Sequence, residues 1–370
     1  MTHSSNGAHS VVQTLVDGGI DVCFANPGTS EMHFMAALDL EPRIRGVLGL
    51  FEGVVTGAAD GFARMADRPA ATLLHLGPGL ANGAANIHNA RRAGSAMVNI
   101  VGDHATYHKR HDAPLTSDVE GIAAPFSDWV RTAESACTVG LDTAAAIQAA
   151  SGKPGRIATL VLPADTAWNA GPGAGTLLPP RVAPRAGADA VVAAARILRS
   201  GEPTAILMTG QVLRSGPLTT ASRIAQATGA QLVAQTSNGR VERGQGRVAV
   251  QRLPYAVDAA LAFLKPYRNL ILVGAKAPVA FFAYPDKPSV LTAAGCRVFT
   301  LTAPDQDGTE ALADLAAELN CTALAPLFLQ RQPEIQGSDD GPLNSASIAR
   351  VVAQSMPENA IVADESVTTG

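Results

Sequence analysis

Three short segments near the start of the chain carry residue types that perform chemistry. Glu52 is an acid set in a run of small residues, 51–64, which reads FEGVVTGAADGFAR. Residues 26–31 (NPGTSE) lie upstream of it, and residues 75–82 (HLGPGLAN) lie downstream. A carboxyl group, an imidazole and a side-chain amide among glycines together predict a cofactor pocket.

Glu52 is the candidate acid–base group of this pocket. A carboxyl group that shares a proton with a ligand needs water to be excluded, and small neighbours such as Gly53 and Gly57 would allow a ligand to approach closely. The alternative is an ordinary acid at a helix N-terminus, where the helix dipole favours negative charge. The local sequence alone favours this alternative, whereas the two neighbouring segments favour the pocket.

His75 follows the apolar run 72–74 and is expected at the carboxyl end of a strand, where open α/β sheets bind ligands. An imidazole at that place suits positioning and proton transfer, although an isolated histidine is more often structural. Gly77, Pro78 and Gly79 predict a loop over the ligand, with Asn82 as a hydrogen-bond donor. A plain Gly/Pro turn is the alternative.

Pro27, Gly28 and Thr29 predict a turn that leads into a helix beginning near Glu31. Gly28 would let the backbone approach a flat ring. An ordinary capped turn between a strand and a helix is the alternative, and without the other two segments it would be favoured.

Three histidines, His104, His108 and His111, surround Lys109 and Arg110 and suggest a metal site. No cysteine or acidic cluster completes a ligand set, so a solvated loop is favoured, with steering of anions toward the pocket as a third interpretation.

Four arginines further along the chain could bind a nucleotide phosphate. They are Arg240, Arg243, Arg247 and Arg252. Because no GxGxxG motif accompanies them, surface salt bridges are favoured.

The composition excludes several classes of function. A net charge of −4 and a pI near 6.1 leave no basic stripe for nucleic acid. No apolar run approaches the roughly 20 residues that cross a bilayer, so no membrane partner is expected and the cytoplasm is the default location. The cysteines lack CxxC spacing, which predicts reduced, mostly buried thiols and neither a zinc knuckle nor a disulfide framework. They are Cys23, Cys137, Cys296 and Cys321.

The hydrophobic pattern predicts an α/β fold of two doubly wound parallel-sheet domains and the start of a third. In the first domain, residues 1–170, apolar runs alternate with helical stretches, which is typical of crossover units. The runs are residues 22–25, 46–50, 70–75, 97–101 and 157–162. Residues 171–187 contain Gly-Pro-Gly and Pro-Pro and predict a linker.

A second alternation predicts a central α/β domain over residues 188–328. Its apolar runs are residues 204–208, 231–234, 269–273 and 296–301, and residues 308–319 predict a helix. Residues 329–344 predict a second linker, followed by a helix at 345–356 and a strand at 360–363. A lone helix and strand cannot bury a core, so residues 345–370 are expected either to dock on an earlier domain or to begin a domain that this chain lacks. The second interpretation, the start of a truncated domain, is favoured.

These segments resemble the pyrimidine-binding domain of thiamine-diphosphate-dependent enzymes, in the group that holds benzoylformate decarboxylase and acetolactate synthase. The resemblance runs from about Ala8 to Trp168, with the three motifs in the family's order. It continues more weakly through residues 238–246 and 274–279, and residues 362–366 resemble the first strand of the family's diphosphate-binding domain. The chain is most similar to the branch of acetolactate synthase-like large subunits.

The resemblance implies roles for individual residues. Glu52 would hydrogen-bond the aminopyrimidine ring of thiamine diphosphate and activate the cofactor. The cofactor site would also include Pro27, Gly28, Gly79 and Asn82. Thr29 stands where benzoylformate decarboxylases carry a substrate-binding serine. His75 stands where related decarboxylases position the carboxylate of a 2-oxo acid and move protons.

The chain also departs from the family. Alignment by the motifs puts Pro114, Leu115 and Asp128 where acetolactate synthases hold substrate with phenylalanine, glutamine and lysine, which argues against acetolactate formation. Ala283 stands near the second active-site histidine of benzoylformate decarboxylase. FAD, which some relatives bind in the central domain, has no supporting motif.

The family's Gly-Asp-Gly…Asn magnesium segment is missing, and Asp103 does not replace it. The magnesium ligands are therefore expected in an absent C-terminal domain. In the family the pyrimidine domain of one subunit faces the diphosphate domain of another, which implies a homodimer or homotetramer.

The sequence therefore predicts a thiamine-diphosphate-dependent 2-oxo acid decarboxylase or carboligase of the acetolactate synthase-like type, activated by Glu52. The alternatives are a non-oxidative decarboxylase like benzoylformate decarboxylase, a noncatalytic relative that lost its cofactor site, and a flavin- or nucleotide-dependent enzyme.

Overall fold

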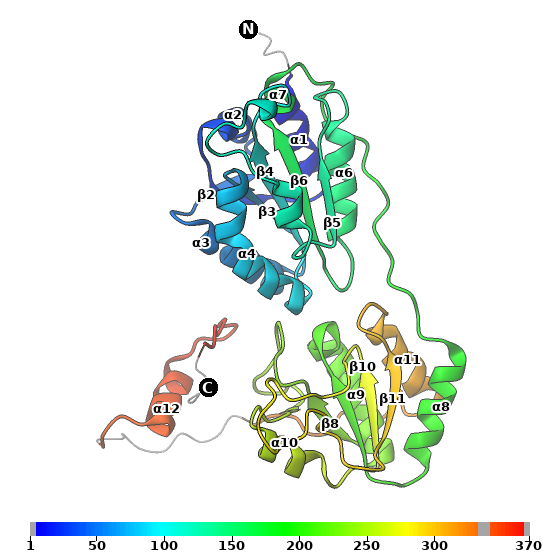
Figure 1. Ribbon diagram of the computed structural model, residues 1–370. Helices are drawn as coiled ribbons and strands as arrows, with labels where there is room; N and C mark the ends of the chain where they lie inside the picture. Colours follow the sequence, from blue (N-terminus) through cyan, green and yellow to red (C-terminus); the bar gives the residue numbers. More distant parts are fainter. Residues whose placement is uncertain (1–4, 332–340, 366–370) are drawn as a thin grey trace.

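The computed structural model describes residues 5–331 and 341–365 of the chain (Figure 1). It contains two α/β units, each built on one parallel sheet. Residues 169–187 connect the two units and form neither a helix nor a strand, apart from a single bridge between Ala170 and Asn6. The predicted fold class, with two doubly wound parallel sheets, is confirmed.

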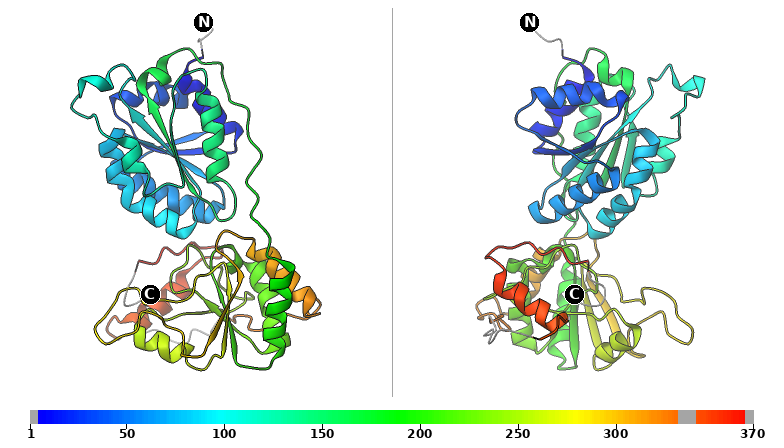
Figure 2. Two further views of the ribbon diagram at one scale, coloured as in Figure 1. Left: turned by 45° about the vertical axis from the view of Figure 1, so that its right-hand side comes forward. Right: turned by 90° about the vertical axis from the view of Figure 1, so that its left-hand side faces the viewer.

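The first sheet has six strands in the order β2-β1-β3-β4-β6-β5, and every pairing is parallel. The strands are β1 (Val22–Asn26), β2 (Arg45–Leu48), β3 (Ala70–Leu74), β4 (Met97–Asp103), β5 (Trp129–Thr132) and β6 (Ile157–Pro163). Helices cover both of its faces (Figure 2). One face packs against α1 (Gly7–Asp17), α2 (Met32–Leu40), α6 (Val139–Ala150) and α7 (Ala164–Trp168). The other packs against α3 (Glu52–Ala66), α4 (Leu76–Ala93) and α5 (Val119–Ala123).

The central strands of this sheet follow from their composition. Every residue of β3, β4 and β6 is buried, as expected for continuous apolar runs covered on both faces. The edge strand β5 was not predicted, because Arg131 interrupts its apolar pattern and its residues are only partly buried. A short edge strand gives a weak sequence signal.

Four polar side chains form a hydrogen-bonded chain inside the sheet. Thr72 Oγ1 donates to Asn99 Oδ1 (2.7 Å), and Asn99 Nδ2 donates to Thr159 Oγ1 (3.2 Å). Thr159 in turn shares a 2.8 Å hydrogen bond with Ser127. Three of the four residues, those on β3, β4 and β6, are fully buried. Because a buried polar group without a partner is costly, these hydrogen bonds favour one register of the three central strands.

The second sheet has five parallel strands in the order β11-β10-β7-β8-β9. They are β7 (Thr204–Met208), β8 (Gln231–Ala234), β9 (Gln251–Arg252), β10 (Asn269–Val273) and β11 (Arg297–Thr302). One face packs against α8 (Ala188–Arg199), α9 (Ser215–Thr228) and α11 (Gly308–Glu318), and the other against α10 (Val257–Leu264). The two-residue edge strand β9 was not predicted.

The last described segment differs from its prediction. The helix is present as α12 (Ser345–Ser355), and the Asn344 side chain accepts a hydrogen bond from Ser347 N at its start. The strand predicted at residues 360–363 is wrong: these residues have no regular structure, and Ile361 and Val362 are 68% and 62% exposed. A strand needs a neighbouring strand for its hydrogen bonds, and none lies beside this segment in the described part of the chain. Ser366, the end of the family-like segment 362–366, lies outside the described residues.

The cysteines are all free. Cys23 and Cys321 are buried as predicted, and burial raises the pKa of Cys23 to about 12. The prediction of burial is wrong for Cys137, which is exposed, and Cys296 is half-buried. Separately, none of the helices in the described ranges combines the length and the apolar content needed to cross a membrane.

Candidate active site

The three candidate segments meet at the carboxyl edge of the first sheet. The strand order places β1 between β2 and β3, and each of these strands leads into one of the segments. From β1 the sheet is wound in both directions, and open α/β sheets bind ligands at such a switch point. Topology therefore brings residues 26–31, Glu52 and residues 75–82 to one place.

Glu52 opens α3 and is buried, with 7% of the residue exposed. Its Oε2 atom accepts a 3.0 Å hydrogen bond from Nδ2 of Asn82 on α4. Its Oε1 atom faces Gly79, where an added Cβ atom would lie 2.9 Å away. Glu52 thus occupies a helix N-terminus, and it also lies beside Gly79 and Asn82, two residues predicted to belong to the same cofactor site.

Small residues allow α3 and α4 to pack closely behind this carboxyl group. Thr56 Oγ1 donates to Gly83 O (3.0 Å), and Asn86 Nδ2 donates to Gly53 O (2.8 Å). A Cβ atom at Gly83 would lie 2.9 Å from the Thr56 methyl group. The contacts fix the distance between the helix that carries Glu52 and the helix that carries Asn82.

His75 lies beside a buried carboxylate. Its Nδ1 atom is 2.8 Å from Oε2 of Glu31, which is 3% exposed. The same Glu31 oxygen accepts a 2.8 Å hydrogen bond from Gly28 N, and Ser30 Oγ donates to its other oxygen (2.8 Å). Because Nδ1 donates to a carboxylate that accepts hydrogen bonds, the Nε2 atom of the partly exposed His75 remains for a ligand.

Two glycines make this arrangement sterically feasible. An added Cβ atom at Gly28 would collide with the His75 ring, and one at Gly102 in β4 would collide with the Glu31 carboxylate. Both glycines are therefore required by close packing around the pair, not by their own backbone angles.

The turn after His75 is strained. Leu76 has φ = +49°, a left-handed conformation that costs a leucine about 1–2 kcal/mol. Its side chain is 1% exposed, and this burial offsets the cost. The turn reverses the chain from β3 into α4. The loop predicted at Gly77, Pro78 and Gly79 is wrong, because these residues form the first turn of α4. His75, Gly79 and Asn82 lie on the same edge of the sheet.

No chemical role is predicted for Glu31 from the sequence, which indicates only that a helix begins near it. Glu31 ends the short 3-10 helix η1 (Thr29–Glu31) ahead of α2. The available signal was its position three residues after Gly28, the spacing at which an acidic side chain reaches back to a backbone N–H.

The other two predicted residues of the turn after β1 make fewer contacts with the site. Pro27 is half-buried, and Thr29 is exposed. In the described residues, the Thr29 hydroxyl makes no hydrogen bond to Glu52, and the Pro27 ring has no group that could make one. The two residues lie in the same turn but are not joined to the carboxyl group.

The histidine group does not form a metal site. The centroids of the His104 and His108 rings lie 5.7 Å apart, as do those of His108 and His111. Asp103 is engaged by Lys109 Nζ at 2.5 Å. Across residues 5–331 and 341–365, no group of three His, Cys, Asp or Glu side chains could hold a metal ion.

The arginine group is partly paired, as the salt-bridge interpretation expected. Arg240 and Arg247 contact Glu242 at 2.7 and 2.9 Å. Arg243 and Arg252 are exposed.

The site fits the pyrimidine end of thiamine diphosphate. Oε1 of Glu52 makes no hydrogen bond within the described chain, so it is available to share a proton with a ring nitrogen. Gly79 keeps the space beside it open, since a methyl group there would approach Oε1. For the diphosphate end, the described residues offer no set of metal ligands.

Comparison with known proteins agrees with this geometry. Residues 5–122 match the family model of the thiamine pyrophosphate enzyme N-terminal TPP-binding domain. The chain is 53% identical over 365 residues to the acetolactate synthase-like large subunit IlvX of Mycobacterium tuberculosis, which covers 99% of this chain and 70% of that protein. Benzoylformate decarboxylase of Pseudomonas aeruginosa is 34% identical over 148 residues, 40% of this chain and 28% of that protein.

Solved structures share the fold. The thiamine-diphosphate-dependent 4-hydroxybenzoylformate decarboxylase of Rhodococcus jostii superposes with a TM-score of 0.79 at 20% identity, covering 96% of this chain and 70% of that one. Benzoylformate decarboxylase of Polynucleobacter necessarius gives a TM-score of 0.78 at 18% identity, over 96% of this chain and 69% of that one. Together with the sequence match to IlvX, this shows that the chain belongs to the family of thiamine-diphosphate-dependent enzymes, in the group of acetolactate synthase-like large subunits.

Proposed function

We propose that the chain acts in a thiamine-diphosphate-dependent enzyme that decarboxylates a 2-oxo acid in the cytoplasm, with carboligation to a second carbonyl compound as an additional activity. The observation that carries the proposal is the buried Glu52, with one carboxylate oxygen held by Asn82 and the other free beside Gly79. When bound, the cofactor supplies a carbon acid that becomes a nucleophile toward the 2-oxo acid and accepts electrons as carbon dioxide leaves.

Glu52 holds a proton at Oε1 and shares it with the pyrimidine ring. Asn82 fixes the orientation of the carboxyl group by donating to Oε2. Gly79 leaves room for the ring, and the first turn of α3 adds the favourable field of a helix N-terminus when the carboxylate is charged. Pro27 and Gly28, in the turn after β1, contribute to the same cofactor site in this proposal.

His75 binds the substrate carboxylate and moves protons through Nε2. Glu31 holds Nδ1 and so sets the tautomer and the ring orientation. The exposed hydroxyl of Thr29 contributes to the substrate side of the same turn.

A specific observation favours decarboxylation over acetolactate formation. Asp128, at the position of the family's substrate lysine, is bound to Arg91 at 3.0 Å and accepts a hydrogen bond from Ile157 N. Ile157 begins β6, so Asp128 serves the amino edge of the sheet, opposite Glu52. Leu115 also lacks the amide of the family's glutamine, and Pro114 lacks the aromatic ring of its phenylalanine. A benzoylformate decarboxylase-like activity is therefore the second candidate.

A homodimer or homotetramer with magnesium is part of the proposal. Apolar side chains beside Glu52 support a partner surface, because large exposed apolar groups that cluster at one place are usually covered. They are Leu48 (68% exposed), Leu50 (90%), Phe51 (49%) and Val54 (60%).

Calorimetry tests the cofactor site directly. Because the described residues offer no metal ligands for the diphosphate end, thiamine diphosphate with magnesium is titrated into the assembled enzyme that contains this chain and into its Glu52→Gln variant. Both proteins are assayed for products from pyruvate, 2-oxobutyrate and benzoylformate. We expect binding to both proteins and turnover only with Glu52. Absence of binding heat at saturating cofactor would favour a noncatalytic relative.

A further inference from the structure

The helix that carries Glu52 also carries the direct hydrogen bonds between the two α/β units. In the described ranges, each hydrogen bond that joins residues 5–168 to residues 188–331 ends on Asp67 or on the last turn of α3. The linker, residues 169–187, has no helix or strand, and it is hydrogen-bonded to the first unit at Gly173, Gly175 and Arg181 and to the second at Pro184 and Arg185. The direct hydrogen bonds between the units, which also set their relative placement, lie at the C-terminal end of α3.

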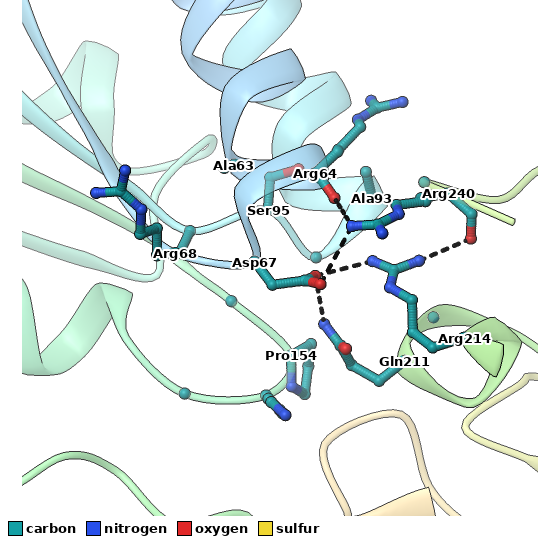
Figure 3. Close-up of a pocket in the computed structure, with 17 residues that line it drawn as sticks. Ala63, Arg64, Asp67, Arg68, Ala93, Ser95, Pro154, Gln211, Arg214 and Arg240 are labelled. Atoms are coloured by element: carbon teal, nitrogen blue, oxygen red, sulfur yellow. Dashed lines mark hydrogen bonds and ion pairs between the residues drawn. The ribbon is translucent and has the colours of Figure 1, made fainter. Parts of the chain in front are cut away.

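Asp67 is the centre of this contact (Figure 3). It caps α3 in a left-handed conformation, with φ = +52°, and lines a crevice between the units. Its carboxylate accepts hydrogen bonds from Arg214 Nη2 (2.9 Å), Arg240 Nη1 (3.2 Å) and Gln211 Nε2 (3.3 Å). Burial acts to raise the pKa of Asp67, but the hydrogen bond and charge of Arg214, with Gln211 and Arg240, hold it below its usual value.

Arg240 donates hydrogen bonds to the last turn of α3 as well as to Asp67, the residue that caps it. Its Nη1 atom donates to the carbonyl oxygens of Met65 (2.9 Å) and Arg64 (3.3 Å), as Figure 3 shows for Arg64. The last carbonyl groups of a helix have no partner within the helix, and a cation at that end interacts favourably with the dipole. The positive charge that satisfies the C-terminal end of α3 therefore comes from Arg240, in the second unit.

Arg240 is itself held in place within the central unit. Its Nη2 atom contacts Oε1 of Glu242 at 2.7 Å, while Oε2 of Glu242 accepts from Ser215 N (2.8 Å) and Arg247 Nη1 (2.9 Å). The side chains of Arg240 and Glu242 are 23% and 18% exposed. A charged network that is partly shielded from water and fully bonded is stiffer than an isolated surface pair.

We propose that Arg240 is a positioning residue for Glu52, acting through α3. The helix has 15 residues and thus spans about 22 Å from Glu52 to its cap. A shift of its C-terminal end along the axis moves its first turn relative to α4, where the Glu52–Asn82 contact is only 3.0 Å long. The central unit in this way sets the geometry of the carboxyl group. The catalytic role of Glu52 rests on the proposed function, whereas its position does not.

The test uses the whole chain without cofactor. Arg240→Gln and Asp67→Asn remove charge from the contact, and Arg240→Lys keeps a cation that can still donate to the carbonyl groups. Arg68→Gln is the matched control: Arg68 follows Asp67 and lines the same crevice, but it pairs with Asp21 inside the first unit.

Two measurements report on α3. Hydrogen exchange follows its N-terminal half, residues 55–60, with α1 as the reference helix. The side-chain amide signals of Asn82 in a ¹⁵N–¹H spectrum report on the Glu52 contact, and Glu52→Gln identifies the change expected when that contact is altered.

We expect Arg240→Gln and Asp67→Asn to raise exchange in residues 55–60 about three- to tenfold with α1 unchanged, and to shift the Asn82 signals. Arg240→Lys should keep both the exchange rates and the Asn82 signals close to those of the wild-type protein. Arg68→Gln should change neither the exchange rates nor the Asn82 signals. Faster exchange confined to the last turn of α3, or an equal rise in α1, would overturn the proposal, as would unmoved Asn82 signals. Failure of thiamine diphosphate to bind would sink only the proposed function.

Discussion

His75 Nδ1 lies 2.8 Å from the buried Oε2 atom of Glu31, although 44 positions separate the two residues. The contact joins the turn after β1 to the turn after β3, and Gly28 N binds the same oxygen. The orientation of a candidate catalytic imidazole therefore depends on a carboxylate that would not be recognised as functional by its type alone.

Glu31→Gln tests how strongly this carboxylate stabilises the fold. The amide keeps the shape but loses one acceptor and faces the donors of Gly28 and His75 with its own N–H groups. We expect the free energy of unfolding to fall by about 2–4 kcal/mol. Urea denaturation measures it, with Glu318→Gln at an exposed ion pair with Arg199 as the control, where under about 1 kcal/mol is expected. Equal losses in both variants would contradict the assigned role of Glu31.

Gly79→Ala tests the space beside Glu52. The added methyl group would lie 2.9 Å from Oε1 and 3.3 Å from the His75 Cβ atom, so we expect at least a tenfold loss of affinity for thiamine diphosphate, measured by calorimetry. Gly61→Ala on α3 is the control, because an added Cβ atom there meets no atom within 4 Å. It should bind normally and be more stable by about 0.5–1 kcal/mol. Normal binding by Gly79→Ala would argue against a ring at that position.

Asn99→Leu tests the polar chain within the first sheet. It leaves the fully buried Thr72 hydroxyl group without its partner, while Thr159 keeps its hydrogen bond with Ser127. We expect a loss of about 1–3 kcal/mol in the free energy of unfolding, the cost of stranding a buried polar group. The double variant Thr72→Val, Asn99→Leu removes the stranded group and should recover part of the loss. A double variant less stable than Asn99→Leu would show that Thr72 stabilises the sheet by something other than its hydrogen bond to Asn99.

The contact between the units should weaken in acid. Because the folded-state pKa of Asp67 is lowered from its ordinary value of 3.8, its contribution is complete above that value and is lost as the pH falls through the lowered one. Small-angle scattering should show the units separating in this acidic range. The Asp67→Asn protein should already be expanded at neutral pH, and its radius of gyration should show no further increase from the titration of this group. A step of equal size in the variant would assign the acid transition to other carboxylates.

Much of the fold follows from local patterns in the chain. The apolar runs that became β1, β3, β4, β6, β7, β8 and β10 are continuous and bounded by turn residues, so each predicts its own strand. The position of His75 directly after the run that became β3 also placed it at the carboxyl edge, where open α/β sheets bind ligands.

Tertiary structure decided what local patterns do not encode. The edge strands β5 and β9 exist because neighbouring strands offer free hydrogen-bonding groups, while residues 360–363 have an apolar pattern but no neighbour and form no strand. The partner of His75 and the interdomain contact of Asp67 with Arg240, 173 positions away, depend on how whole elements pack. The sequence by itself determined which residues could do chemistry and the edge of the sheet on which they would lie. Only the folded chain decided which buried charged side chains meet, because long-range topology sets such pairs and spacing along the chain does not.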